Sequence, residues 1–157
     1  MSRGKLVAVV GAPCAALLLS QVPKFEGMVL RGYRDPVGIV TACAGHTKTA
    51  VMGRAYTLEQ CQDILEADLV EHAQGVLACV PELKGRTWPL AAASSFAFNV
   101  GVGLFCASTM AARFRAGDVV GGCNELPRWT MAGGKVLPGL VARRASERAI
   151  CLREVAP

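Results

Sequence analysis

The distribution of hydrophobic and polar residues divides the chain into three stretches with different periods. Residues 6–22, LVAVVGAPCAALLLSQV, contain no charged residue. Residues 26–47 combine short β-branched pieces with glycines and with Asp35-Pro36, which is typical of a small hairpin or meander. From Thr57 onward, apolar residues recur at helical intervals. The pattern therefore predicts an apolar N-terminal segment, a small β unit and a helical remainder.

The helical remainder carries recognisable start and stop signals. Thr57 is expected to cap the first helix, with Gln60 three residues later as its capping-box partner. Further helices are expected over residues 89–101, from Ser108-Thr109 onward, and over residues 140–155, with glycine-rich pieces between them. A small β unit followed by four or five helices is an α+β arrangement, with a cleft between its two parts.

The uncharged N-terminal stretch has the character of an export segment. As a helix it would span roughly 25 Å, slightly short of the ~30 Å hydrocarbon core of a bilayer. Arg3 and Lys5 precede it, so the N-terminus is expected to stay in the cytoplasm. No small-x-small cleavage site follows, and Gly11, Pro13, Ser20 and Gln21 lower its hydrophobicity. The sequence favours an uncleaved, weakly held membrane segment; a cleaved signal peptide and a buried core helix are the alternatives.

Composition narrows the class of protein. With 157 residues, there is room for one ordinary domain and a short appendage. Apolar residues make up 52% and charged residues 18%, which excludes a disordered chain. The formal charge of +5 suits an anionic partner such as nucleic acid, acidic lipid or the bacterial cell wall. The densest basic run, Arg143, Arg144 and Arg148, is interpreted as solvated surface. Seven cysteines favour an oxidising compartment and leave one unpaired.

Two acids in the β region are candidates for chemistry. Glu26 and Asp35 stand nine residues apart, with Thr41 after them. Hydrolysis of a glycosidic bond needs one carboxyl group that holds a proton and one that stays ionised. The apolar residues Phe25, Met28 and Val29 are expected to surround Glu26 and to favour its protonated form. Spacing alone does not establish the pair, because acids so placed are usually surface residues.

Longer motifs around these acids are more specific. They are Glu26-Gly27, Tyr33-x-Asp35-x-x-Gly38-x-x-Thr41 and Gly45-His46-Thr47. They resemble the active-site signature of the phage lysozymes of glycoside hydrolase family 24. Downstream pieces match as well: SFAFNVG at residues 95–101, Ser108-Thr109, Gly117-Asp118, Arg128-Trp129 and GLVARRASER at residues 139–148. The resemblance covers residues 24–153.

The resemblance implies a lysozyme-like α+β fold, with a small β-hairpin lobe, a larger helical lobe, a cleft between them and an N-terminal apolar helical segment. It implies an N-acetylmuramidase that cuts the β-1,4 bond between N-acetylmuramic acid and N-acetylglucosamine in peptidoglycan. Glu26 would be the general acid, Asp35 the base or electrostatic partner, and Thr41 would help to hold the attacking water. Inversion requires the carboxyl groups to lie about 6.5–9.5 Å apart. A lytic transglycosylase and an inactive membrane-tethered wall-binding module are the alternatives.

Other residues receive roles from the same resemblance. Asn99 and Gly101 would lie near the cleft, where Asn99 either contacts a sugar or caps local structure. His46 is expected to be structural, held by Asp68 of the following helix. Cys43 and His46 form a C-x-x-H pair, but no second pair follows at a zinc-finger spacing. We expect neither a metal nor a cofactor.

The family includes endolysins with a signal-arrest-release segment, and residues 1–23 resemble one, with residues 24–157 as the muramidase domain. While residues 6–22 lie in the bilayer, Glu26 is within ~14 Å of extended chain from its end, so it cannot settle opposite Asp35. The expected partners are peptidoglycan and, transiently, the bacterial inner membrane, but not nucleic acid. The protein is expected to act in the periplasm, as a monomer, once it is released.

The cysteines leave one question open. Cys14 is either a passive small residue or, once it is released from lipid, a thiol that attacks a disulfide at Cys43. Many relatives have glycine at the position of Cys43, and the cysteine form resembles a lambdoid subgroup. For the other six cysteines we expect the pairs Cys79–Cys106, Cys123–Cys151 and Cys43–Cys61, although spacing does not decide the connectivity.

Overall fold

The uncharged N-terminal stretch forms two helices. In the computed structural model, which describes residues 4–155, α1 covers Lys5–Val10 and α2 covers Ala12–Glu26. Gly11 separates them because its φ of 84° lies in the left-handed region, which glycine adopts without steric cost. Among residues 4–155, no helix is both long enough and apolar enough to span a bilayer.

One face of these two helices is buried at four-residue intervals, by Leu6, Val10, Cys14, Leu18 and Val22. Residues four apart lie on the same face of a helix, so these side chains form one stripe. The stripe joins the main hydrophobic core, where α1 packs against α3 and α2 against α4. Helix α2 also continues past position 23, up to Glu26. In this structure the segment therefore packs into the core, which corresponds to one of the two alternatives named for it, a buried core helix.

The predicted hairpin is confirmed. Strand β1 (Val29–Arg34) pairs antiparallel with β2 (Val40–Cys43), with Tyr33 opposite Thr41 and a register shift between Val29 and Tyr33. A third piece of chain approaches β1 at Gly32, where an added Cβ would lie 1.9 Å from the carbonyl oxygen of Val51. Only glycine allows the two backbones to come so close.

Helix α3 (Leu58–Cys79) connects the hairpin to the rest of the molecule. Thr57 Oγ1 accepts a hydrogen bond from the Gln60 backbone, and the Gln60 side chain accepts one from Thr57 N, so the predicted capping box is confirmed. A small second core of Ala42, Cys43, Tyr56 and Cys61 lies under the hairpin. The Cys43–Cys61 disulfide fastens β2 to the first turn of α3.

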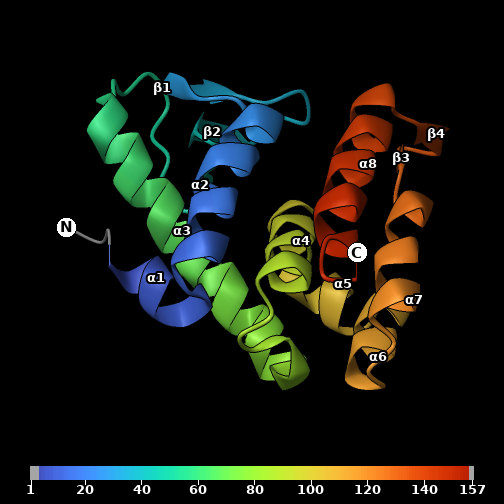
Figure 1. The fold of residues 1–157 in the computed structure, drawn as a ribbon. Helices are drawn as coiled ribbons and strands as arrows, with labels where there is room; N and C mark the ends of the chain where they lie inside the picture. Colours follow the sequence, from blue (N-terminus) through green and yellow to red (C-terminus); the bar gives the residue numbers. More distant parts are fainter. Residues whose placement is uncertain (1–3, 156–157) are drawn as a thin grey trace.

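The helical lobe surrounds α4 (Thr87–Val100), which lies between α3 and α8 (Pro138–Leu152) in Figure 1. The other helices of this lobe are α5 (Val102–Cys106), α6 (Thr109–Arg115) and α7 (Val119–Asn124), with 3₁₀ turns η1 (Pro81–Leu83) and η2 (Leu126–Arg128). Within residues 4–155, six α-helices follow the hairpin, where four or five were predicted. The difference arises because glycines divide the region after α4 into short pieces.

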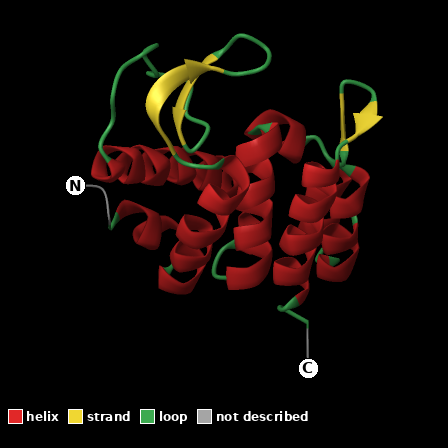
Figure 2. Ribbon diagram, turned by 90° about the horizontal axis from the view of Figure 1, so that it is seen from above, coloured by secondary structure: helices red, strands yellow, loops and turns green. Residues whose placement is uncertain are grey.

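A second small hairpin precedes α8. Strands β3 (Met131–Ala132) and β4 (Lys135–Val136) are joined by Gly133 and Gly134, both with positive φ, as a two-residue turn of the mirror-image type requires. Figure 2 shows the two hairpins on the same side of the helices, apart from one another. The architecture is the predicted α+β arrangement, a small β lobe against a larger helical lobe.

Candidate active site

Glu26 is the last residue of α2, and Gly27 ends the helix with a φ of 77°. Its side chain faces the loop after β2, because a Cβ added to Gly45 would lie 3.0 Å from Glu26 Oε2. On the other side, Glu26 Oε1 accepts a hydrogen bond of 2.5 Å from Arg143 Nη1 of α8. The carboxylate is thus held between the hairpin lobe and the helical lobe.

Of the three apolar residues expected around Glu26, only Phe25 lines a cavity together with it in the described part of the chain. Met28 lines a different hollow, Val29 is exposed on β1, and the ring of Phe25 lies under the guanidinium of Arg143, 4.8 Å from it. The group nearest the Glu26 carboxylate is instead the cation of Arg143. The sequence prediction rested on residues next to Glu26 in the chain, whereas Arg143 lies 117 positions away from it.

Asp35 and Thr41 meet at Ile39, in the turn between β1 and β2. Asp35 Oδ1 accepts hydrogen bonds from the backbone of Val37 (3.0 Å) and of Ile39 (2.8 Å). Thr41 Oγ1 donates to the carbonyl oxygen of Ile39 (3.1 Å), and Thr41 is buried. The turn therefore fixes both side chains on the hairpin. The structure assigns Glu26 and Asp35 different partners, and their separation of about 6.5–9.5 Å stays a prediction.

A cavity of about 520 Å³ opens beside Glu26, between the ends of α2 and α4 and the start of α8. Its lining includes Lys24, Phe25, Asn99, Leu137 and Arg143. Neither Asp35 nor Thr41 is among the described residues that line it. The cavity is large enough for part of a small ligand, since ligand pockets typically enclose ~300–1,000 Å³.

Asn99 and Gly101 differ in their relation to this cavity. Asn99 lines it, and its Oδ1 accepts a hydrogen bond from Arg144 Nη2. Gly101 ends α4 with a φ of 96°, and its backbone N–H bonds to Ala97 O. Gly101 therefore has a clear local role as a helix cap, whereas Asn99 has a side chain at the cavity.

The basic run on α8 is mostly buried, so its interpretation as solvated surface is wrong for two of three residues. Arg143 is 4% exposed and Arg144 1%, while Arg148 is exposed. Burial lowers the pKa of Arg144, and the carboxylates of Glu147 and Glu26 oppose that effect. Buried guanidinium groups require acceptors, and Glu147 bonds to both arginines.

His46 contacts Asp68, the partner that the sequence predicted for it. Its Nδ1 lies 2.7 Å from Asp68 Oδ2 of α3, and its Nε2 lies 2.7 Å from Thr49 Oγ1 and accepts from Thr49 N. This assigns the proton to Nδ1, which donates to the carboxylate. His46 therefore ties the loop after β2 to α3, close to Gly45.

The three predicted disulfides, Cys43–Cys61, Cys79–Cys106 and Cys123–Cys151, are all present. Because Cys43 is bonded to Cys61, it offers no thiolate to a metal at the C-x-x-H pair. Cys14 is free and fully buried, and desolvation raises its thiol pKa to about 12. In this arrangement Cys14 therefore behaves as a small core residue rather than as an exposed nucleophile.

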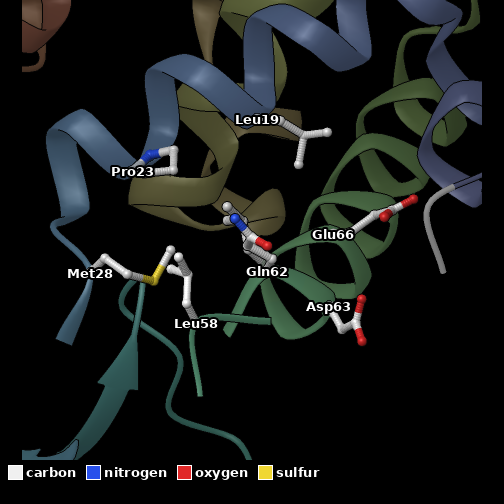
Figure 3. A pocket seen from close by; sticks show the side chains of 8 residues that line it. Leu19, Pro23, Met28, Leu58, Gln62, Asp63 and Glu66 are labelled. Atoms are coloured by element: carbon white, nitrogen blue, oxygen red, sulfur yellow. The ribbon is translucent and has the colours of Figure 1, made fainter. Parts of the chain in front are cut away.

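A larger hollow of about 670 Å³ lies between α2 and α3, and Glu26 is not among the described residues that line it. Figure 3 shows Leu19, Pro23, Met28 and Leu58 around it, with Glu66 at one side. Glu66 is buried and accepts a hydrogen bond from Leu6 N at the start of α1 (3.3 Å). This hollow contains none of the predicted catalytic side chains.

The sequence model of the family described as "Phage lysozyme" matches residues 23–147. SAR-endolysins of Bacteriophage PS119 and Enterobacteria phage PA-2 are 39% and 40% identical over 133 residues, which is 81% of this chain and 76% and 77% of theirs. The chain belongs to the phage lysozyme family.

One solved relative is known in two forms, and the two match this fold differently. The active form of the P1 phage endolysin Lyz aligns with a TM-score of 0.79 at 21% identity, over 99% of this chain and 96% of that one. Its secreted inactive form aligns with a TM-score of 0.60 at 18% identity, over 91% and 96%. At such identities the likeness concerns the fold alone, and the fold follows the active form more closely.

Proposed function

We propose that this protein is an endolysin with muramidase activity, which hydrolyses the β-1,4 bond between N-acetylmuramic acid and N-acetylglucosamine. The observation that carries the proposal is the position of Glu26: its carboxylate lies between the hairpin that bears Asp35 and Thr41 and a cavity lined by Asn99. The family membership and the SAR-endolysin relatives support the same activity.

The proposed reaction divides the work between the two lobes. Glu26 donates its proton to the departing sugar oxygen, while Asp35 takes a proton from a water molecule that attacks the anomeric carbon from the opposite face. Thr41 orients that water. The backbone hydrogen bonds to Asp35 Oδ1 hold this carboxylate in place within its turn. The sugar in front of Asn99 would occupy the cavity beside Glu26.

We also propose that residues 6–22 first hold the enzyme at the inner membrane and join the core after they leave it. Two observations support this. The segment has one buried stripe and an outer face on which Val7 and Leu19 remain 41% and 40% exposed, so it is apolar on more sides than the fold requires. Glu26 ends the helix that the segment builds, so docking of α2 is what places the acid.

The activity is tested with purified peptidoglycan. Glu26→Gln should abolish release of soluble fragments, and Glu59→Gln, at an exposed position in the first turn of α3, should leave it intact. Fragments with reducing N-acetylmuramic acid ends support the proposal. Ends of the 1,6-anhydro type would replace it with a transglycosylase, and an active Glu26→Gln variant would remove Glu26 from the reaction.

The tether is tested by fractionation of expressing cells before and after membrane depolarisation, with the digestion assay on each fraction. The full-length chain should move from the membrane to the soluble fraction and gain activity there. A chain that is soluble and active from the outset, or that has lost its N-terminal residues, would overturn the tether and leave the muramidase proposal standing.

A further inference from the structure

We propose that Glu147 positions the general acid through Arg143 and balances the charge around it, a role that rests on the proposed muramidase function. Arg143 has three different acceptors. Its Nη1 donates to Glu26 Oε1, its Nε to Glu147 Oε1 (3.0 Å), and its Nη2 to the carbonyl oxygen of Ser95 (2.9 Å). The guanidinium group cannot turn without breaking several of these bonds, so its orientation, and with it that of Glu26, is fixed.

Glu147 is itself fully engaged, although it is 1% exposed. Its Oε1 accepts hydrogen bonds from Ser95 Oγ (2.8 Å) and Arg143 Nε, and its Oε2 accepts one from Arg144 Nη1 (2.7 Å). A buried carboxylate of this kind persists only when charged and polar partners compensate for its loss of water. Glu147 is not among the described residues that line the cavity beside Glu26. It therefore acts through Arg143 and not on a substrate.

The charges around Glu26 explain why the carboxylate of Glu147 matters for the proposed reaction. From α8, Arg143 and Arg144 supply two cations and Glu147 one anion. Lys24 lines the same cavity from the helix of Glu26, and the hairpin lobe presents Gly45 to Glu26 and carries Asp35 in its turn. Two uncompensated guanidinium groups would favour the ionised form of Glu26, which cannot donate a proton. Glu147 supplies a negative charge beside both guanidinium groups and so offsets part of that positive field.

The network continues to the other side of the cavity. Arg144 donates to Asn99 Oδ1 and, through Nε, to the carbonyl oxygen of Trp129 (3.0 Å). Burial lowers the pKa of Arg144, and the negative charges of Glu147 and, more weakly, Glu26 act in the opposite direction. One buried carboxylate thus connects the proton donor to the side chain of Asn99 at the cavity.

The test measures kcat/KM on purified peptidoglycan as a function of pH, because its alkaline limb reports loss of the proton from the free enzyme's acid. Glu147→Gln removes the compensating charge and should move this limb about one pH unit lower. Arg144→Gln removes a cation and should move it higher. Glu147→Asp keeps the charge, so the limb should stay near its wild-type position even where kcat falls.

Glu125→Gln is the matched control. Glu125 is also a buried glutamate that pairs with two arginines, Arg113 and Arg128, but it is not among the described residues that line the cavity beside Glu26. The Glu125→Gln substitution should lower thermal stability without moving the alkaline limb of kcat/KM. The inference is overturned if the alkaline limb of Glu147→Gln coincides with that of wild type. It is also overturned if the limb moves in the same direction in Glu147→Gln and Arg144→Gln. If Glu147→Gln does not fold, Arg144→Gln and Glu147→Asp still decide. An active Glu26→Gln variant would instead refute the proposed function itself.

Discussion

Glu26 Oε1 and Arg143 Nη1 lie 2.5 Å apart and join the end of α2 to α8 across 117 positions of sequence. This pair connects the N-terminal segment to the C-terminal helix. Glu26 reaches its place only when α2 is docked, and Arg143 only when Ser95 of α4 and Glu147 have bound it. The position of the Glu26 carboxylate therefore depends on the assembly of the helical lobe around it.

Replacement of Arg143 by lysine should reduce kcat by about 100-fold, with a smaller effect on KM. Lysine retains the charge but cannot reach Glu26, Glu147 and the Ser95 carbonyl oxygen together, so Glu26 loses its fixed orientation. Steady-state digestion of peptidoglycan measures this change. Arg148→Lys, five residues further along α8 and exposed, serves as control, and equal losses in the two variants would show that the orientation of Arg143 is unimportant.

The buried thiol of Cys14 should make stability depend on alkaline pH. Burial raises its pKa from 9.0 to about 12, so above pH 9 the folded protein keeps a proton that the unfolded chain loses. This contribution to stability is complete below pH 9 and is lost as the pH rises toward 12, at about 1.4 kcal/mol per pH unit. The free energy of unfolding, measured with denaturant just above pH 9, should therefore fall more steeply with pH in wild type than in Cys14→Ala.

The same burial should protect Cys14 from thiol reagents in the folded enzyme. Labelling should require unfolding, and it should then modify one thiol per chain while the disulfides stay oxidised. Rapid labelling of the native, detached enzyme would contradict this expectation and would favour the interpretation of Cys14 as a redox-active residue.

Replacement of Asp68 by alanine should destabilise the hairpin lobe by about 1–3 kcal/mol, because it leaves the buried Nδ1–H of His46 without its acceptor. Activity of the folded fraction should change by no more than a few fold, since His46 holds the loop and does not reach the reaction. Thermal melting and initial rates test both expectations. In the control, Glu71→Ala breaks an exposed pair with Lys48 and should cost less than about 1 kcal/mol.

Two faces of the N-terminal segment should respond differently to substitution. Leu18 is buried in the core, so Leu18→Ala should destabilise the detached enzyme by about 2–5 kcal/mol. Ser20 is exposed, so Ser20→Leu should leave the fold intact but increase the fraction retained in the membrane after depolarisation.

Ala149→Leu adds apolar surface at an exposed position outside the segment, and it should not increase membrane retention. Equal retention in Ser20→Leu and wild type would argue that the hydrophobicity of residues 6–22 does not govern release.

Local signals in the sequence predicted much of the fold. The capping box at Thr57 and Gln60 is a pattern of adjacent residues, and so are the turn at Asp35-Pro36 and the glycines that end helices. The pairing of His46 with Asp68 and the three disulfides were expected and are present, although spacing in the sequence did not decide them. The hairpin at Gly133-Gly134 was missed, although two consecutive glycines between short strands are a recognised turn signal.

The network around Glu26 was missed for a different reason. The segment RRASE places two arginines three and four residues before Glu147, and this spacing puts them on one helix face. The sequence does not show whether that face is solvated or buried. Because α8 packs against α4, the face turns inward and the charged side chains must pair with each other and with Glu26.

The amino-acid sequence by itself determined the elements of this protein, the candidate acids and the apolar character of residues 6–22, because each depends on residues close together in the chain. Only the tertiary structure decided that one stripe of this segment belongs to the core, that Cys14 is inaccessible there, and that Arg143 holds Glu26. Burial and charge pairing arise from contacts between distant segments, and such contacts exist only when α2, α4 and α8 have packed together.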